Sequence, residues 1–200
     1  MESTGIYWQP VYNVLEEAFD GSMVLIVANA RHMKNVPGKK TDMKDAEWIA
    51  TLLRAGLLAG SFIPSKPIRE LRNLTRYRKS IVEEITSQKN RIEKHLQSCG
   101  FKLSIFLTDI FGVSGRTIID HLSCYGKISA REVEAFVKGR AKKKTNEIKQ
   151  AVNGKMDLHQ REFLKLMLGW LDQHYRHLHQ TEQRLDEKLG QYLKATGTIR

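Results

Sequence analysis

The sequence predicts an α/β segment over residues 1–61 and a mostly helical region over residues 66–195. Three observations favour this division. In the first segment, a short apolar run lies between two helical patterns, as a buried strand of an α/β fold does. In the second, apolar residues recur three or four apart over 67–99 and again over 157–193. The charge also changes along the chain. Residues 1–60 hold six Lys/Arg and seven Asp/Glu and so carry −1, and because the net charge is +11, residues 61–200 carry +12.

Within the first segment, the order of elements is helix, strand, loop and helix. Residues 7–19 have helical apolar spacing, and residues 22–30 form the Val- and Ile-rich run that predicts a strand. Pro37-Gly38 marks a loop. Residues 42–58 then predict a second helix with a single apolar stripe.

In the second region, the pattern over residues 67–99 predicts one helix of roughly 45–50 Å, and residues 157–193 predict a second. Their spacing is typical of a coiled coil or an antiparallel helix pair. Glycines divide residues 101–155, which we interpret as a small helical insert. The boundary between the two regions falls near 62–65.

Composition limits the classes of function. The 200 residues have a net charge of +11 and a pI of about 9.7, which favours a polyanionic partner, either nucleic acid or an anionic membrane surface. No run of about 18 apolar residues predicts a membrane span, and the first residues do not form a signal peptide. Cys99 and Cys124 lack metal-ligand spacing. We therefore expect a cytoplasmic protein.

Two carboxylates open the predicted helix over residues 42–58. Asp42 and Asp45 are three apart and so share one helical face. With a third acid they would suit Mg²⁺, which prefers hard oxygen ligands. Asp42 also suits an N-cap and Asp45 a capping box, and spacing alone favours capping. Glu2 precedes a polar turn and is a further candidate, although a solvated terminal acid is the simpler reading.

Basic residues gather at two places. Residues 66–102 hold ten Lys/Arg against four Asp/Glu, an imbalance that favours a polyanion over a solvated helix flank. Within them, one helical face carries a basic stripe made of Arg69, Arg72, Arg76 and Lys79. A second group, the lysine cluster, is made of Lys142, Lys143 and Lys144. Both are candidate phosphate contacts.

Five segments, in order, resemble the DEDD transposases of the insertion-sequence 110 family, which are relatives of the Piv invertases. The first segment, Met1-Glu2-Ser3-Thr4-Gly5-Ile6-Tyr7-Trp8, is similar to their second acidic motif. Lys40-Thr41-Asp42-Met43-Lys44-Asp45-Ala46 is similar to their paired third and fourth acids. Residues 31–38, 71–78 and 111–116 also resemble family segments.

The resemblance implies a partial RuvC-like, RNase H-type fold for the α/β segment. It implies that Glu2, Asp42 and Asp45 are catalytic residues that bind Mg²⁺, and it favours this role over capping. It also implies long coiled-coil helices used in assembly and nucleic-acid binding. The expected partners are DNA, a structured guide RNA and further copies of the chain, with no membrane.

The same resemblance implies two parts that these residues do not include. The family's first Asp lies on a strand before the Glu motif, and a later domain carries a serine that attacks the DNA backbone. We therefore expect a transposase acting by Mg²⁺-dependent strand cleavage and transfer, of which this polypeptide alone is an inactive fragment. The alternative is a non-catalytic nucleic-acid-binding or dimerisation protein.

Overall fold

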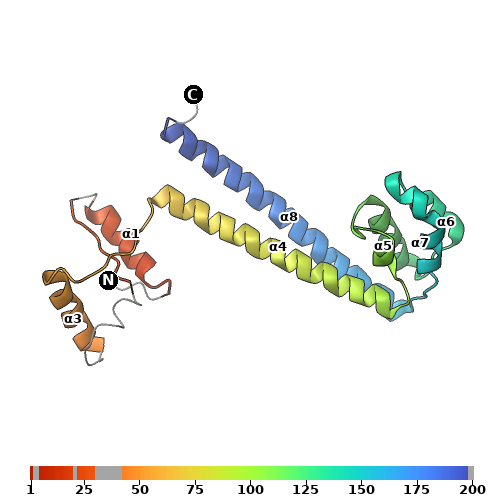
Figure 1. Cartoon of the computed structure of the whole chain (residues 1–200), viewed down its shortest axis with the longest axis horizontal. Coiled ribbons are helices and arrows are strands. Elements are labelled where there is room, and N and C mark those ends of the chain that lie inside the picture. The colour runs from red at the N-terminus through yellow and green to blue at the C-terminus, as the bar shows by residue number, and fades with distance from the viewer. Residues whose placement is uncertain (2–4, 20–21, 30–41, 198–200) are drawn as a thin grey trace. The chain divides into compact units, whose positions relative to one another are not determined.

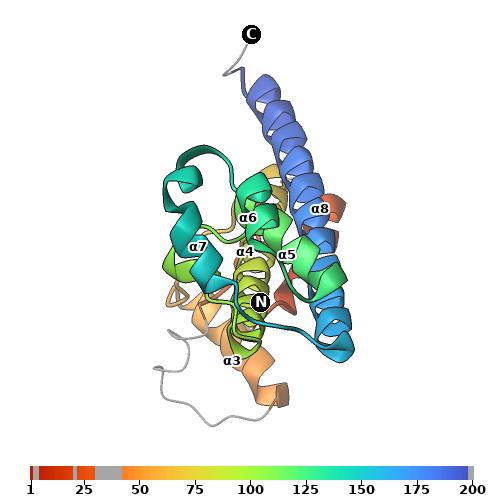
Figure 2. The same cartoon turned by 90° about the vertical axis from the view of Figure 1, so that its right-hand side faces the viewer.

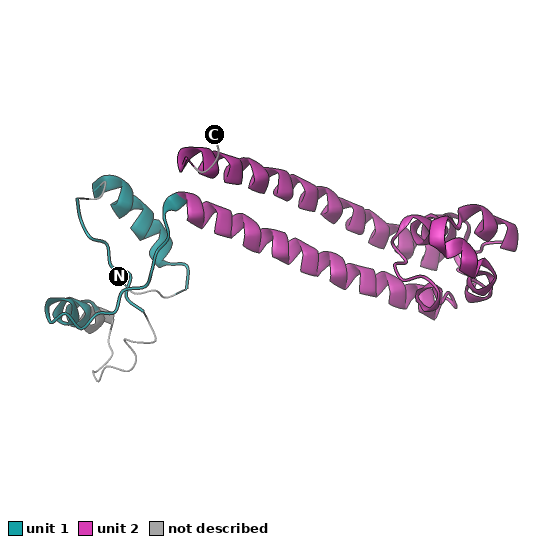
Figure 3. Cartoon of the chain, turned by 45° about the horizontal axis from the view of Figure 1, so that its top comes forward, with its two compact units in different colours: residues 1–66 teal, residues 67–200 magenta. Residues whose placement is uncertain are grey.

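The computed structural model describes residues 1, 5–19, 22–29 and 42–197, with the side chains of residues 42–45 excepted. The chain divides into two compact units, Met1–Lys66 and Pro67–Arg200 (Figure 3). Within the described residues, no helix combines the length and the apolar character that crossing a membrane requires.

The first unit is built from helices and extended backbone. Its helices are α1 (Trp8–Phe19) and α3 (Asp42–Arg54). In its described residues, the only strand pairing is an isolated antiparallel bridge between Ala28 and Gly60, and no sheet is present. The prediction of an α/β, RuvC-like and RNase H-type fold is therefore wrong for this structure, which is mostly helical.

The extended segment over residues 22–29 explains this difference. Its backbone bonds on one side to Met1, where the Ala28 amide donates to the Met1 carbonyl at 2.7 Å. On the other side, the Ser61 amide donates to the Val27 carbonyl at 2.7 Å. Burial reaches only Val27 and Ala28. Val24 is 84% exposed. An apolar run reports side-chain preference for a strand, whereas a sheet needs neighbouring strands of comparable length.

The second unit is dominated by two long helices, α4 (Lys66–Ser98) and α8 (Leu158–Ala195), which confirm the two predicted helices. They lie side by side and antiparallel (Figures 1 and 2). Cross-links set the register: Lys188 bonds Glu70 at 2.6 Å near one end, and the His95 imidazole meets the Gln160 carbonyl at 2.9 Å near the other. With 33 residues, α4 is about 50 Å long.

A helical insert (residues 101–156) closes the pair where α4 ends and α8 begins (Figure 1). It holds three α-helices and two 3₁₀ helices: η1 (Leu103–Ile105), α5 (Val113–Tyr125), α6 (Ala130–Phe136), η2 (Gly139–Lys144) and α7 (Thr145–Ala151). Its core is continuous with the adjoining ends of the long helices. The fully buried side chains of this core include Phe101, Ile118, Leu122, Ile148 and Leu164.

One arginine ties the insert to α8. The Arg116 guanidinium donates to both carboxylate oxygens of Asp172 at 2.7 and 2.8 Å, and its Nε donates to Asp120 at 2.9 Å. The hydrogen bond to Asp172, more than that to Asp120, raises the pKa of Arg116 above its ordinary value. Because Asp172 lies on α8 and Arg116 on α5, the two helices are joined by a fork-like ion pair.

Candidate nucleic-acid interface

The predicted acidic residues fall mainly outside the described residues. Asp42 is the first residue of α3, which also contains Asp45, but their side chains are not described, and neither is Glu2. The predicted metal site therefore stays a prediction. Elsewhere, in the part of the chain that the structure describes, no three His, Cys, Asp or Glu side chains are grouped to hold a metal ion.

The basic stripe lies on the solvent side of α4. Buried residues of this helix, such as Ile81, form the opposite face; Arg72 precedes Ile81 by nine residues, which is about two and a half turns. Arg72 and Arg76 are exposed, and no described acidic side chain pairs with either. Lys79 is 3.7 Å from Glu83 in a largely exposed pair, a weak interaction. These cations are therefore available to an external anion.

The fourth member of the stripe differs from the others. Arg69 is only partly exposed and has an interaction of its own within the protein. The structure thus supports Arg72, Arg76 and Lys79 as a solvent-facing group more strongly than it supports Arg69.

The lysine cluster forms the end of η2. Lys142, Lys143 and Lys144 are all exposed, while Ala141 in the same short helix packs partly against the core. The Thr145 hydroxyl donates to the Lys142 carbonyl at 2.8 Å and so fixes where η2 passes into α7. Three adjacent cations are held on ordered backbone, which favours phosphate binding because less conformational entropy is lost.

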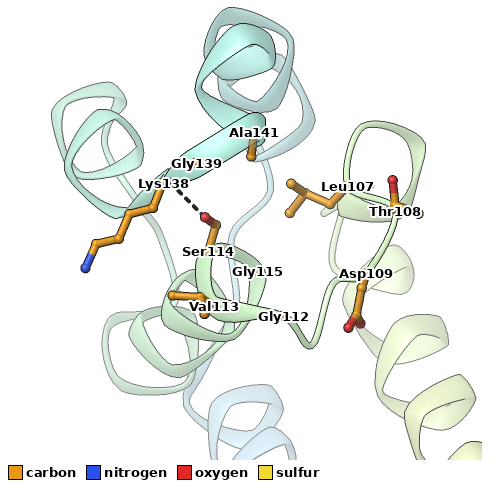
Figure 4. A pocket seen from close by; sticks show the side chains of 10 residues that line it. All are labelled: Leu107, Thr108, Asp109, Gly112, Val113, Ser114, Gly115, Lys138, Gly139 and Ala141. Atoms are coloured by element: carbon orange, nitrogen blue, oxygen red, sulfur yellow. Dashed lines mark hydrogen bonds between the residues drawn. The ribbon is translucent and has the colours of Figure 1, made fainter.

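A pocket of about 400 Å³ connects the start of η2 with the start of α5 (Figure 4). Lys138 and Gly139 line one side, and Gly112 to Gly115 line the other. The buried Ser114 hydroxyl accepts a hydrogen bond from the Lys138 amide at 2.8 Å, so it positions the η2 segment rather than capping α5. A side chain at position 115 would meet the Ile110 carbonyl at 2.2 Å, which explains the glycine.

Sequence reasoning missed a groove that lies between α4 and α8. A line of Phe163, Leu166 and Trp170 runs along α8 beside the seam residues Leu164 and Met167, and it is partly open to solvent. In the sequence, this line is a second series of apolar residues that stands one position before the seam residues. Heptad spacing did not reveal it, because a helix–helix seam accounts for only one series of apolar residues.

Comparison with known proteins identifies a family. The family model of the DEDD insertion-sequence 110 class, described as Transposase, matches residues 1–101, just over half of the chain. This stretch includes Glu2, Asp42, Asp45 and the basic stripe but not the lysine cluster. Neither a curated protein nor a solved structure matches the chain.

Proposed function

The chain belongs to the DEDD transposases of the insertion-sequence 110 family, and from that premise we propose that it acts in DNA transposition by Mg²⁺-dependent strand cleavage and transfer. Family membership favours this function over a non-catalytic binding protein. DNA is the partner that a transposase implies. The division of labour that we propose places chemistry in Met1–Lys66 and DNA binding in Pro67–Arg200.

For the chemistry, we propose Glu2, Asp42 and Asp45 as the Mg²⁺ ligands. The donor set fits the ion, because all three offer carboxylate oxygens and Mg²⁺ prefers hard oxygen ligands. Asp42 and Asp45 belong to the first turn of α3, so their backbone positions are one turn apart. When bound, the metal would activate the attacking nucleophile and stabilise the leaving oxygen.

For DNA binding, we propose the basic stripe and the lysine cluster as phosphate contacts. The observation that carries the proposal is that Arg72 and Arg76 are exposed, lack a described acidic partner and lie opposite the buried face of α4. Side chains three or four residues apart on a helix are separated by about 5–6 Å. A single phosphate backbone can therefore contact consecutive members of the stripe.

The DNA-binding test is a salt series with labelled duplex DNA. Each lost phosphate contact lowers the slope of log K against log salt by about 0.9, so Arg72→Ala/Arg76→Ala is expected to reduce the slope by about 1.8. The matched control is Arg176→Ala/Arg184→Ala, which removes the same charge from exposed sites on α8. An equal loss in both variants would show that only net charge matters, and would refute the stripe.

The metal test is calorimetric titration of the full chain with Mg²⁺. Asp42→Asn is expected to weaken Mg²⁺ binding at least about 10-fold, because it replaces an anionic ligand by a neutral one. Asp186→Asn, an exposed acid on α8, serves as the control. Equal Mg²⁺ affinity in the two variants would exclude Asp42 as a ligand.

We extend the proposal to two further partners, a structured guide RNA and a second copy of the chain. The basic surfaces suit RNA phosphates as well as those of DNA. Exposed apolar side chains on the long helices, such as Tyr77 and Leu189, support self-association through them. Binding of a structured RNA in the same salt series tests the first, and sedimentation equilibrium tests the second. A monomer at all accessible concentrations would contradict self-association.

A further inference from the structure

The groove between α4 and α8, called here the aromatic groove, combines apolar rings with cations. It has a volume of about 540 Å³ and is lined by Gln88, Arg91, Lys94, Phe163, Leu166, Met167 and Trp170. No acidic side chain belongs to this described lining. Leu166 is 72% exposed and Phe163 is 46% exposed, so the groove presents an uncovered apolar surface.

The polar group on the groove floor is already satisfied. Buried Gln88 donates to the Met167 carbonyl at 3.2 Å, and its side-chain oxygen accepts from Arg91 at 3.5 Å. A ligand in this groove would therefore meet apolar side chains and two cationic heads. Lys94 makes no described ion pair and is exposed.

Trp170 is held in place from one side. Its indole stacks on the His174 imidazole, with ring centroids 3.4 Å apart and planes 19° apart. His174 contacts Glu84 on α4 through Nε2 at 3.2 Å, which fixes the imidazole in turn. A preorganised ring loses little side-chain entropy when a further flat ring stacks on its remaining surface.

Lys94, one of the residues that line the aromatic groove, lies in line with the basic stripe on α4. Arg76 and Lys94 are 18 residues apart, which is five turns of 3.6 residues and about 27 Å. They therefore have the same angular position on the helix. An extended phosphate backbone that follows α4 would pass from the stripe to Lys94.

We propose that the aromatic groove binds unpaired bases of single-stranded DNA, with Trp170 as the stacking surface and Arg91 and Lys94 as phosphate contacts. The inference rests on the proposed DNA-binding function and adds a strand-specific site to it. Stacking on aromatic side chains tolerates any base and is available only where bases are unpaired. A site for phosphate alone would not need Phe163 or Trp170.

Charge complementarity distinguishes this occupant from a second copy of the chain. An apolar helix from another copy would cover Leu166 and Phe163 but would also bury or crowd Arg91 and Lys94. Burying a cation without a partner is costly, and a polyanion supplies that partner directly. The cationic rim therefore favours nucleic acid.

The experiment uses the 200-residue chain with Trp8→Phe and Trp48→Phe, which leaves Trp170 as the single tryptophan. It is titrated with an oligothymidylate of about 12 nucleotides and with an abasic oligonucleotide of equal length, which keeps the phosphates but lacks bases. Trp170 emission is expected to be quenched by the first, with affinity on the order of 10-fold above that for the second. Trp170→Leu is expected to abolish this preference, whereas Tyr125→Leu, an exposed aromatic outside the groove, leaves it unchanged.

Four outcomes would overturn the proposal: equal affinity for the two oligonucleotides, DNA binding without change in Trp170 emission, tighter binding of oligouridylate than of oligothymidylate, or emission that changes with protein concentration alone. The last would assign the groove to a second copy. Circular dichroism confirms that each variant is folded. Duplex DNA binding measured in parallel separates the two hypotheses. If duplex binding persists while Trp170 emission does not change, only the groove inference fails. If duplex binding is absent, the proposed DNA binding fails.

Discussion

Removing the Arg116 ion pair is expected to loosen the helical insert from α8. Arg116→Met keeps most of the apolar stem but deletes the bonds to Asp172 and Asp120. Hydrogen bonds to charged groups contribute about 1.5–3 kcal/mol each when buried. Here Arg116 is 26% exposed, and its partners Asp172 and Asp120 are 42% and 51% exposed, so solvent screening reduces the total to about 2 kcal/mol.

That loss corresponds to a fall in melting temperature of about 6 °C for a unit of this size. The assay is thermal unfolding followed by circular dichroism. Arg176→Met, an exposed arginine on α8 without a described ionic partner, is the control and is expected to change stability by less than about 0.5 kcal/mol.

A double-mutant cycle with Asp172→Asn isolates the interhelical pair. Its coupling energy is expected to be about 1–2 kcal/mol, since the two bonds of the fork form together. A coupling energy below about 0.3 kcal/mol, or an Arg116→Met variant as stable as the control, would refute the conclusion that this pair joins α5 to α8.

Three further predictions concern stability and are read by thermal unfolding. Gly154→Ala is expected to lower the stability of the fold by about 1–3 kcal/mol, because the new Cβ would lie 2.2 Å from the Cys99 carbonyl oxygen. The control Gly169→Ala has open space around it and is expected to raise stability by about 0.5–1 kcal/mol. A Gly154→Ala variant more stable than Gly169→Ala would contradict the close approach of Gly154 to Cys99. Gln88→Leu is expected to be nearly neutral, because the Met167 carbonyl keeps its helical partner and an apolar replacement leaves no buried donor; a large loss would show that the glutamine is needed. Hydrogen bonds from the Ser129 side chain and backbone lower the pKa of Glu132 below its ordinary value. This carboxylate therefore stabilises the fold above its ordinary pKa, and the stabilisation disappears as the pH falls through the lowered pKa. The melting temperatures of Glu132→Gln and the parent should differ at neutral pH and converge in acid, and a pH-independent difference would contradict this.

The long helices were predictable from sequence because their seams repeat over many turns. The pattern over residues 67–99 closely anticipates α4, and no glycine or proline interrupts it after Pro67. Local order of this kind depends on contacts between neighbours in the sequence. The structured insert over residues 101–156 depends instead on close approaches, such as that of Gly154 to Cys99, which no periodicity reveals.

The predicted sheet failed for a related reason. The run over residues 22–30 has the composition of a strand, but strand pairing is a property of its partners, and the described partners are Met1 and residues 59–61. The site was predictable in part. Charge and spacing predicted the basic stripe, whose position on α4 the structure describes and whose binding role stays a prediction. The proposed stacking role of Trp170 could not be predicted from sequence, because it depends on the stack with His174 and on residues of the opposite helix.

Burial along the α4–α8 pair is uneven, and this sets a gradient of local stability. Buried side chains of α4 begin at Ile81 and continue toward the insert, while the first turns of α4 and the last turns of α8 are linked through exposed pairs such as Lys188–Glu70 and Arg78–Glu182. Amide hydrogens near Leu71 and Leu193 should thus exchange through local opening, and those near Ile92 and Leu164 only through global unfolding. The helix pair is therefore most stable where it joins the insert and frays most readily at its far end.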